Sequence, residues 1–291
     1  MKGKRVIWLR YLILRKPMRY WRPGTNFIDL ILRTYSRDLR DEDFVVISEK
    51  ALSVALGEIL DESELEIGIC VKAATDLVRK VWWLIGRICG IKGPLEEIAS
   101  LPLDIISKHK ALALKVGGMK HFLKPLSEAG IDASNLPLSY VSLPLRNPNR
   151  VADDIRKNVE EETGRRVNVL IQDTDKSFLL KGSSLILATR PSEVKGLRDW
   201  GALSYLLGMC FKGLFRAFPT PVGYSGEEMD PIRLLKIARA AESSRGWGTG
   251  RDVFEMATTF GVQPNGVTWE MLEERPHFPV VIVRLKGRNA R

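Results

Sequence analysis

The feature that most constrains the fold is a short apolar run at residues 169–171, which ends in Gln172-Asp173-Thr174-Asp175. An unbroken apolar run of this length, without polar alternation, predicts a strand buried on both faces. A second such run, Phe44–Ile47, is followed directly by Ser48-Glu49-Lys50. Because open α/β sheets bind ligands beyond the carboxyl ends of their strands, we expect Asp173 and Asp175 to lie at a ligand site.

A dense polar turn, Ala129–Asn135, precedes the apolar run at residues 169–171 by about forty residues. Asp132, Ser134 and Asn135 provide side-chain oxygens that favour tight turns, and Asp132 can also present a carboxylate to a hard cation. Together with Asp173 and Asp175, this turn predicts a metal-bridged phosphate site. Singly, Asp132 also fits a simple turn residue and Asp173 a helix cap.

The sequence Ser48-Glu49-Lys50 lies between a strand and a predicted helix start, which suits a phosphate group. The plainer interpretation is a capped helix with a solvated Lys50, and on these residues alone both remain open. Strands and helices alternate irregularly along the chain, which favours a mixed α/β (α+β) fold over an all-α or all-β one.

Five further segments carry structural expectations. Residues 5–14 are expected to enter the sheet as a strand, since Arg10 interrupts them and they are too short to span a bilayer. Residues 81–91 predict the buried end of a helix, residues 110–116 a strand, 151–163 an amphipathic helix, and 279–284 a closing strand.

Composition is that of a globular protein, with 291 residues of which 45% are hydrophobic and 27% charged. The net charge of +10 favours anionic partners, and eight Lys or Arg with no acid lie between Lys2 and Arg22. The loop 244–251 combines three glycines with two arginines but matches no nucleotide-binding fingerprint. The alternative function is therefore a non-catalytic binder of nucleotide or nucleic acid, although no nucleic-acid-binding motif is present.

Cysteine and histidine usage excludes some classes of site. Cys70, Cys89 and Cys210 are scattered in apolar settings without CxxC spacing, which predicts buried, reduced thiols in a cytoplasmic protein. The three histidines show no metal-binding spacing, so a zinc site is not expected.

Three of these motifs together resemble the coenzyme F420-0:L-glutamate ligase (γ-glutamyl ligase) family. The family has a DxVVIAxK strand, an AGVDASN turn and a DT pair that closes a later strand. The corresponding segments here are residues 43–50, Ala129–Asn135 and Asp173-Thr174. The resemblance covers roughly residues 25–225, and the AGIDASN turn is its most specific element.

The resemblance implies a two-lobed α/β homodimer with the nucleotide at or near the subunit interface. It implies an enzyme that uses GTP with Mg²⁺ or Mn²⁺ to join L-glutamate to a carboxylate of the deazaflavin coenzyme through an acyl phosphate. By position, Asp132 and Asp173 would be metal ligands, with Thr174 near a second metal. The residues facing the nucleotide would be Ser48, Glu49, Lys50, Ser53 and Asn135.

The chain also departs from the family pattern. Val54 follows Ser53 where the family often has Lys, and Asp175 stands where it has Phe, so Asp175 is expected to assist the second metal. Residues 226–277 do not follow the pattern, which predicts a core at residues 1–225 and a divergent C-terminal helical segment with a closing strand at 226–291. The acceptor acid and the number of glutamates added stay open.

Overall fold

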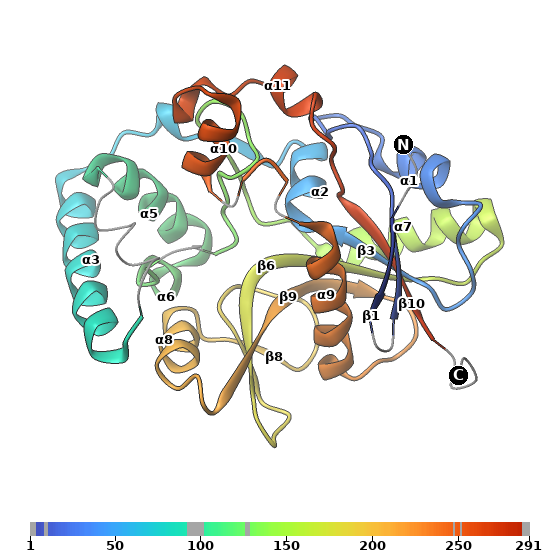
Figure 1. Cartoon of the computed structure of the whole chain (residues 1–291). Helices are drawn as coiled ribbons and strands as arrows, with labels where there is room; N and C mark the ends of the chain where they lie inside the picture. The colour runs from blue at the N-terminus through green and yellow to red at the C-terminus, as the bar shows by residue number, and fades with distance from the viewer. Residues whose placement is uncertain are drawn as a thin grey trace.

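The computed structural model describes residues 4–8, 11–91, 102–125, 129–246, 248–250 and 252–286 (Figure 1). The strands are β1 (Lys4–Trp8), β2 (Tyr11–Arg15), β3 (Phe44–Ser48), β4 (Ile59–Asp61), β5 (Tyr140–Ser142), β6 (Asn168–Leu180), β7 (Ile186–Ala188), β8 (Leu197–Asp199), β9 (Phe215–Ser225) and β10 (Val280–Leu285). The helices are α1 (Phe27–Tyr35), α2 (Glu49–Ala55), η1 (Glu62–Glu64), α3 (Ile69–Cys89), α5 (Leu103–Gly117), α6 (Met119–Phe122), α7 (Pro148–Thr163), α8 (Ala202–Cys210), α9 (Pro231–Arg245), α10 (Val253–Phe260), η2 (Pro264–Gly266) and α11 (Trp269–Glu273). The expectation of a mixed α/β fold is confirmed.

An eight-stranded mixed sheet forms the centre, in the order β1-β2-β10-β3-β6-β7-β8, with β9 paired along the long strand β6. The two apolar runs of the sequence are β3 and the first half of β6, and they pair in parallel with Ser48 opposite Gln172. Their polar ends therefore lie side by side. The register between β6 and β9 shifts near Gln172 and Asp173, as at a β-bulge, and bulges often re-aim side chains beside active sites.

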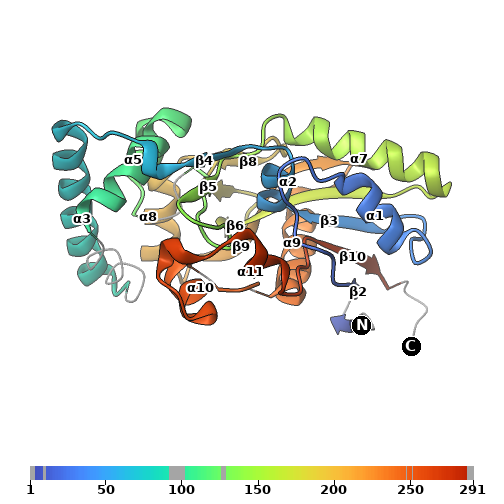
Figure 2. The same cartoon turned by 90° about the horizontal axis from the view of Figure 1, so that it is seen from above.

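Helices cover both faces of this sheet, which is why its strands are apolar without alternation. On β3, Val45 and Ile47 pack in the same core cluster as residues of α1, α2 and α7. Phe44 and Val46 point to the opposite face and pack with residues of α9. Figure 2 shows the sheet between these two helical layers.

A separate group of helices, α3, α5, α6 and α8, lies at one end of the molecule around its own apolar cluster (Figure 1). Here the expectation of three buried, reduced thiols is wrong. Cys89 at the end of α3 is joined to Cys210 at the end of α8 by a disulfide, and Cys70 is a free, exposed thiol. The two paired residues are 121 positions apart, so their meeting depends on helix packing that spacing does not reveal.

Three local expectations need correction. Residues 110–116 form the second half of α5 and not a strand, since Ala, Leu and Lys are strong helix formers whose propensity outweighs their short alternation. Residues 5–14 fall in two strands, because β1 and β2 form an antiparallel hairpin. The helix ending near residue 90 is confirmed, and Gly90 caps it with a left-handed φ of 64°. The predicted burial of this helix end is wrong, since Trp83, Leu84 and Ile88 are exposed.

The C-terminal residues are part of the central sheet. β10 lies between β2 and β3, and α9 packs on the face formed by Phe44, Leu170 and Val281. The division of the chain at residue 225 stays a prediction. Within the described residues, no helix combines the length and apolar character needed to span a membrane.

The disulfide gives the first prediction. Unfolded in denaturant without reductant, the chain should expose one reactive thiol, Cys70, and after reduction three. A Cys89→Ser/Cys210→Ser variant should lose about 2–4 kcal/mol of unfolding free energy, because a cross-link between distant residues restricts the unfolded chain. Thiol titration and urea unfolding measure both effects. Three reactive thiols without reductant would show that the cross-link does not form.

Candidate active site

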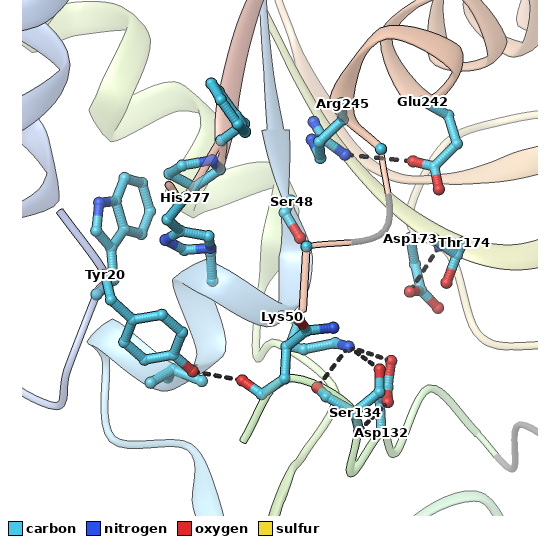
Figure 3. A pocket seen from close by; sticks show the side chains of 18 of the residues that line it. Tyr20, Ser48, Lys50, Asp132, Ser134, Asp173, Thr174, Glu242, Arg245 and His277 are labelled. Carbon is cyan, nitrogen blue, oxygen red and sulfur yellow. Dashed lines mark hydrogen bonds and ion pairs between the residues drawn. The ribbon is translucent and has the colours of Figure 1, made fainter. Parts of the chain in front are cut away.

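A cavity of about 130 Å³ lies where β3 and the first half of β6 end. Several parts of the chain meet there: the strand ends with α2, the turn at 132–135, the end of α9 with its following loop, the segment before β10, and the segment after β2 (Figure 3). The lining residues are Tyr20, Trp21, Ser48, Lys50, Ala51, Val54, Asp132, Ser134, Asn135, Gln172, Asp173, Thr174, Glu242, Arg245, Gly246, Gly248, Gly250, His277, Phe278 and Pro279.

Lys50 and Asp132 form an ion pair at the cavity wall, as Figure 3 shows. The Lys50 Nζ lies 2.5 Å from Asp132 Oδ2 and donates to the backbone oxygen and the Oγ of Ser134, at 2.9 and 2.7 Å. The other carboxylate oxygen of Asp132 accepts from the backbone N–H of Ser134 at 2.7 Å. All three ammonium donors of Lys50 are thus satisfied by the turn, and its charge neutralises that of Asp132.

Beneath the cavity, the buried guanidinium of Arg190 binds two carboxylates. It donates to both oxygens of Glu49 and, through one of the same nitrogens, to Asp173 Oδ2 at 2.6 Å. Glu49 also accepts from the backbone N–H of Leu145 at 2.9 Å. Glu49 therefore serves the interior and does not line the cavity. Sequence reasoning missed Arg190, because it follows β7 in a stretch with no recognisable motif.

The glycine of the AGIDASN turn makes room for this guanidinium. Gly130 has a φ of +85°, and a Cβ placed there would lie only 2.3 Å from Cζ of Arg190. A side chain at this position would both strain the backbone and displace the arginine. The turn is therefore adapted to the ion cluster below it as well as to the cavity above it.

Glu49 and Asp173 share the guanidinium of Arg190, and their pKa values shift in opposite directions. Burial raises the pKa of Glu49 to about 7, although Arg190 acts against this shift. Burial also acts to raise the pKa of Asp173, but the charge and hydrogen bond of Arg190, with the charge of Lys50, bring it below its ordinary value. Asp173 therefore keeps its charge next to the cavity, while Glu49 takes up a proton near neutral pH.

Asn135 connects the turn to the loop after α9. Its Oδ1 accepts from the backbone N–H and the Oγ1 of Thr249, both at 2.7 Å, and its Nδ2 donates to the Gly250 oxygen at 3.0 Å. Tyr20 donates its hydroxyl hydrogen to the backbone oxygen of Asn135. A Cβ on Gly248 would lie 2.5 Å from Asn135 Oδ1, so this close approach requires glycine. Trp247 and Arg251 of this loop lie outside the described residues.

The opposite wall comes from residues that sequence reasoning did not single out. Gln172 Nε2 donates to Glu242 Oε2 at 2.9 Å, and Arg245 lies 3.4 Å from the same oxygen. His277 stacks on Tyr20, and burial lowers its pKa to about 4, so it is neutral at pH 7. The only sequence signal for this wall was the basic, glycine-rich loop that contains Arg245. No recognisable motif surrounds Glu242 or His277.

The predicted site residues divide into two groups. Ser48, Lys50, Asp132, Asn135, Asp173 and Thr174 line the cavity. Glu49 and Ser53 are buried behind it, and Asp175 turns inward, where it lies 3.5 Å from Lys124. Their catalytic and binding roles stay predictions.

The donor set fits a hard cation that also binds phosphate. No group of three or more His, Cys, Asp and Glu suited to a metal occurs among the described residues. The cavity nevertheless offers carboxylate oxygens of Asp132 and Asp173, together with Gln172 Oε1, which is buried without a hydrogen-bond partner. Mg²⁺ is commonly held by one or two carboxylates plus substrate phosphates, which matches this set.

Gly130 provides a test of the ion cluster. Gly130→Ala should reduce the unfolding free energy by at least about 2 kcal/mol more than Gly164→Ala, because only Gly130 is packed against Arg190. Gly164 is a suitable control, since its φ is +66° and nothing lies within 4 Å of its Cβ position. Both variants carry the left-handed backbone cost of about 1–2 kcal/mol. Equal losses in urea unfolding would contradict the packing.

The pKa of Glu49 predicts a pH dependence of stability. Its value rises from 4.5 to about 7 on folding, so the stability linked to its bound proton is complete below pH 4.5 and lost as the pH rises through 7. Glu49→Gln mimics the protonated form. Relative to this variant, the unfolding free energy of the unmodified chain should fall by up to about 3 kcal/mol between pH 4 and pH 8. If the difference in unfolding free energy between the two proteins, measured in urea, does not change with pH, the raised pKa of Glu49 is refuted.

Comparison with known proteins shows which proteins this chain is similar to. The chain is 27% identical over 279 residues to the uncharacterized protein MJ1361 of Methanocaldococcus jannaschii, covering 92% of this chain and 94% of that protein. It is 29% identical over 223 residues to the coenzyme F420:L-glutamate ligase of the same organism, covering 74% and 82%. The corresponding ligase of Methanopyrus kandleri is 28% identical over 153 residues, covering 53% and 55%.

The family model described as F420-0:Gamma-glutamyl ligase matches residues 17–209, which include Lys50, Asp132, Asp173 and Arg190. It stops before Glu242, Arg245 and His277. On the extent of this match, the chain belongs to the F420-0:gamma-glutamyl ligase family.

Proposed function

We propose that the chain is a GTP- and divalent-metal-dependent γ-glutamyl ligase that joins L-glutamate to a carboxylate of coenzyme F420-0 or a related acid. The observation that carries this proposal is the meeting of Lys50, Asp132 and Asp173 at one cavity, from three segments far apart in the chain. Relatives covering most of this chain include a protein named coenzyme F420:L-glutamate ligase.

In the proposed complex, Asp132 and Asp173 would hold Mg²⁺ or Mn²⁺ beside the bound GTP. When bound, the cation would neutralise charge on the transferring phosphoryl group. A cation at Asp132 competes with Lys50 for the same carboxylate. Lys50 would then leave Asp132 and place its point charge on the nucleotide phosphates.

The chemistry requires positioning more than covalent help from the protein. A carboxylate oxygen of the acceptor attacks the γ-phosphorus, GDP leaves, and an acyl phosphate forms. The amine of glutamate then attacks the acyl carbon, releasing phosphate and a proton as the amide forms. Glu242 and Arg245 on the opposite wall form a pair of opposite charges, which suits the ammonium and a carboxylate of glutamate.

We assign the remaining predicted residues supporting roles. Ser48, Thr174 and Asn135 line the cavity and would contact the nucleotide or its metal. Glu49 would act indirectly by holding Arg190, and thus Asp173, in place. We also propose that the protein works as a homodimer in the cytoplasm, where GTP and glutamate are available.

The proposal predicts that GDP binding depends on divalent metal. Isothermal titration calorimetry should show GDP binding at least tenfold tighter in Mn²⁺ than in EDTA, about 1.4 kcal/mol. Asp132→Asn should remove most of this gain without weakening the binding in EDTA, since Lys50 is then free for phosphate. Equal affinity in Mn²⁺ and EDTA would contradict a metal-bridged site.

The matched control is Asp230→Asn, which removes one carboxylate at the start of α9, away from the cavity. Asp230 caps this helix through a hydrogen bond to the backbone of Ile232, and Asn caps about as well as Asp. Its metal-dependent gain in GDP affinity should equal that of the unmodified chain.

A further inference from the structure

Two arginines contact the same aromatic ring where α9 packs along β9 (Figure 1). Arg239 lies on α9 and Arg216 on β9, and the ring between them is that of Phe218. The Cζ atom of Arg239 lies 3.9 Å from the ring centroid, and that of Arg216 lies 5.7 Å from it. Arg216 and Phe218 are two positions apart on one strand, so both point to the sheet face that α9 covers. Two positive charges are thus held close together.

No acid neutralises this pair within the described residues, where neither Arg216 nor Arg239 forms an ion pair. The next acid along α9 is Glu242, which lines the cavity and is already bound by Gln172 and Arg245. The two guanidiniums therefore keep their full charge.

The arrangement costs free energy in the chain alone. Arg239 is partly buried, and its pKa is lowered by that burial and by the positive charge of Arg216. Burial of an unpaired charge is unfavourable, and like charges at close range repel each other. Stacking on Phe218 returns only part of this cost, about 0.5–1 kcal/mol for each arginine. A local arrangement that lowers stability without compensation is typical of a functional site.

The donors of this pair are arranged for an oxyanion. Arg239 Nη2 donates to the backbone oxygen of Ala217, which holds the plane of this guanidinium over the ring of Phe218. Across the part of the chain that the structure describes, no other N–H of the two side chains meets an acceptor. Planar guanidinium groups bind phosphate oxygens bidentately. The exposed Lys236, three positions before Arg239 on α9, adds a further positive charge nearby.

The surroundings favour the phosphate group of a small ligand over a nucleic-acid strand. Proteins that bind single strands stack the bases on exposed aromatic rings, whereas Phe218 is only 3% exposed beneath its arginines. Two guanidiniums on one ring also provide one place for an anion and not a row of places. A phosphate monoester carries about two negative charges at neutral pH, which balances the two arginines.

We propose that Arg216 and Arg239 bind a phosphate group of a small ligand, at a site separate from the cavity. Arg239 precedes Glu242 of the cavity wall by three residues, about 4.5 Å along the helix axis. The site is thus within reach of a ligand that also occupies the cavity. The phosphate group belongs either to the acceptor of the ligase reaction or to a separate phosphorylated molecule. The first of these sources rests on the proposed function, whereas the phosphate site itself does not.

Isothermal titration calorimetry with inorganic phosphate in EDTA tests the site without any turnover. Arg216→Gln and Arg239→Gln should each weaken phosphate binding at least tenfold. Arg239→Lys should weaken it as well, because an ammonium group lacks the planar fork. The matched control is Arg233→Gln, which removes one exposed arginine from the same helix and should leave the affinity unchanged. Circular dichroism checks that all variants fold.

Three results would overturn the proposal. The unmodified chain does not bind phosphate, both Gln variants bind it as tightly as the unmodified chain, or a single-stranded oligonucleotide binds through the same arginines and is not displaced by phosphate.

Arginine labelling locates the bound phosphate. Phenylglyoxal modification followed by mass spectrometry should show that phosphate protects Arg216 and Arg239 and leaves Arg233 reactive. The protection should persist when GDP and Mn²⁺ are present, because the site is separate from the cavity. Protection confined to Arg245 would place the phosphate in the cavity and refute the proposal.

Steady-state kinetics separates the two sources of the phosphate group. If the acceptor carries it, Arg239→Gln should raise the KM of the acceptor at least tenfold and leave the KM of GTP unchanged. If a separate molecule carries it, both KM values stay unchanged while calorimetry still shows the loss of phosphate binding. An unmodified chain without ligase activity would contradict the proposed function alone, since the calorimetric and labelling results decide the phosphate site.

Discussion

The buried guanidinium of Arg190 holds the site together. It links Glu49 at the start of α2 to Asp173 on β6 and passes through the space that Gly130 leaves in the turn. Removing one partner of such a buried cluster typically costs about 3–5 kcal/mol, because the remaining charges lose their compensation. The position of Asp173 at the cavity, and the conformation of the turn that carries Asp132, both depend on this one side chain.

The cavity is completed by the part of the chain that follows the family-matched residues. Asn135 fixes the loop after α9 through three hydrogen bonds, and the end of α9 itself supplies Glu242 and Arg245 to the cavity that Lys50 also lines. β10 lies in the middle of the sheet, so the segment before it delivers His277 to a fixed place. One wall therefore draws Lys50, Asp132 and Asp173 from within the family-matched range, and the opposite wall draws Glu242, Arg245 and His277 from beyond it.

The sequence was sufficient to predict the parts of the fold and site that depend on local patterns. The apolar runs that form β3 and β6 predicted strands, and the acids after β6 with the AGIDASN turn predicted a site shared by Asp132 and Asp173. The family resemblance added Lys50 to that site. Arg190, Glu242 and His277 could not be found in this way, because no recognisable motif surrounds them and they reach the site only through tertiary packing.

Other features were predicted wrongly from the sequence for related reasons. The Cys89–Cys210 bond joins residues 121 positions apart and depends on the docking of α3 against α8. The second half of α5 alternates like a strand, yet its Ala, Leu and Lys residues favour a helix. Asp175 shares a short motif with Asp173, but the bulge in β6 turns it toward Lys124 in the interior. Pattern alone does not show on which side of a bulge a carboxylate will lie.

We propose that this cavity forms an amide bond between glutamate and an acid. The most direct test is to incubate the protein with GTP, Mn²⁺, isotope-labelled L-glutamate and coenzyme F420-0, and to analyse the products by mass spectrometry. We expect a product that carries labelled glutamate and forms together with GDP and phosphate. The Asp132→Asn variant should not form this product. GTP hydrolysis that ignores glutamate, or no labelled product with F420-0 or any related acid, would contradict it.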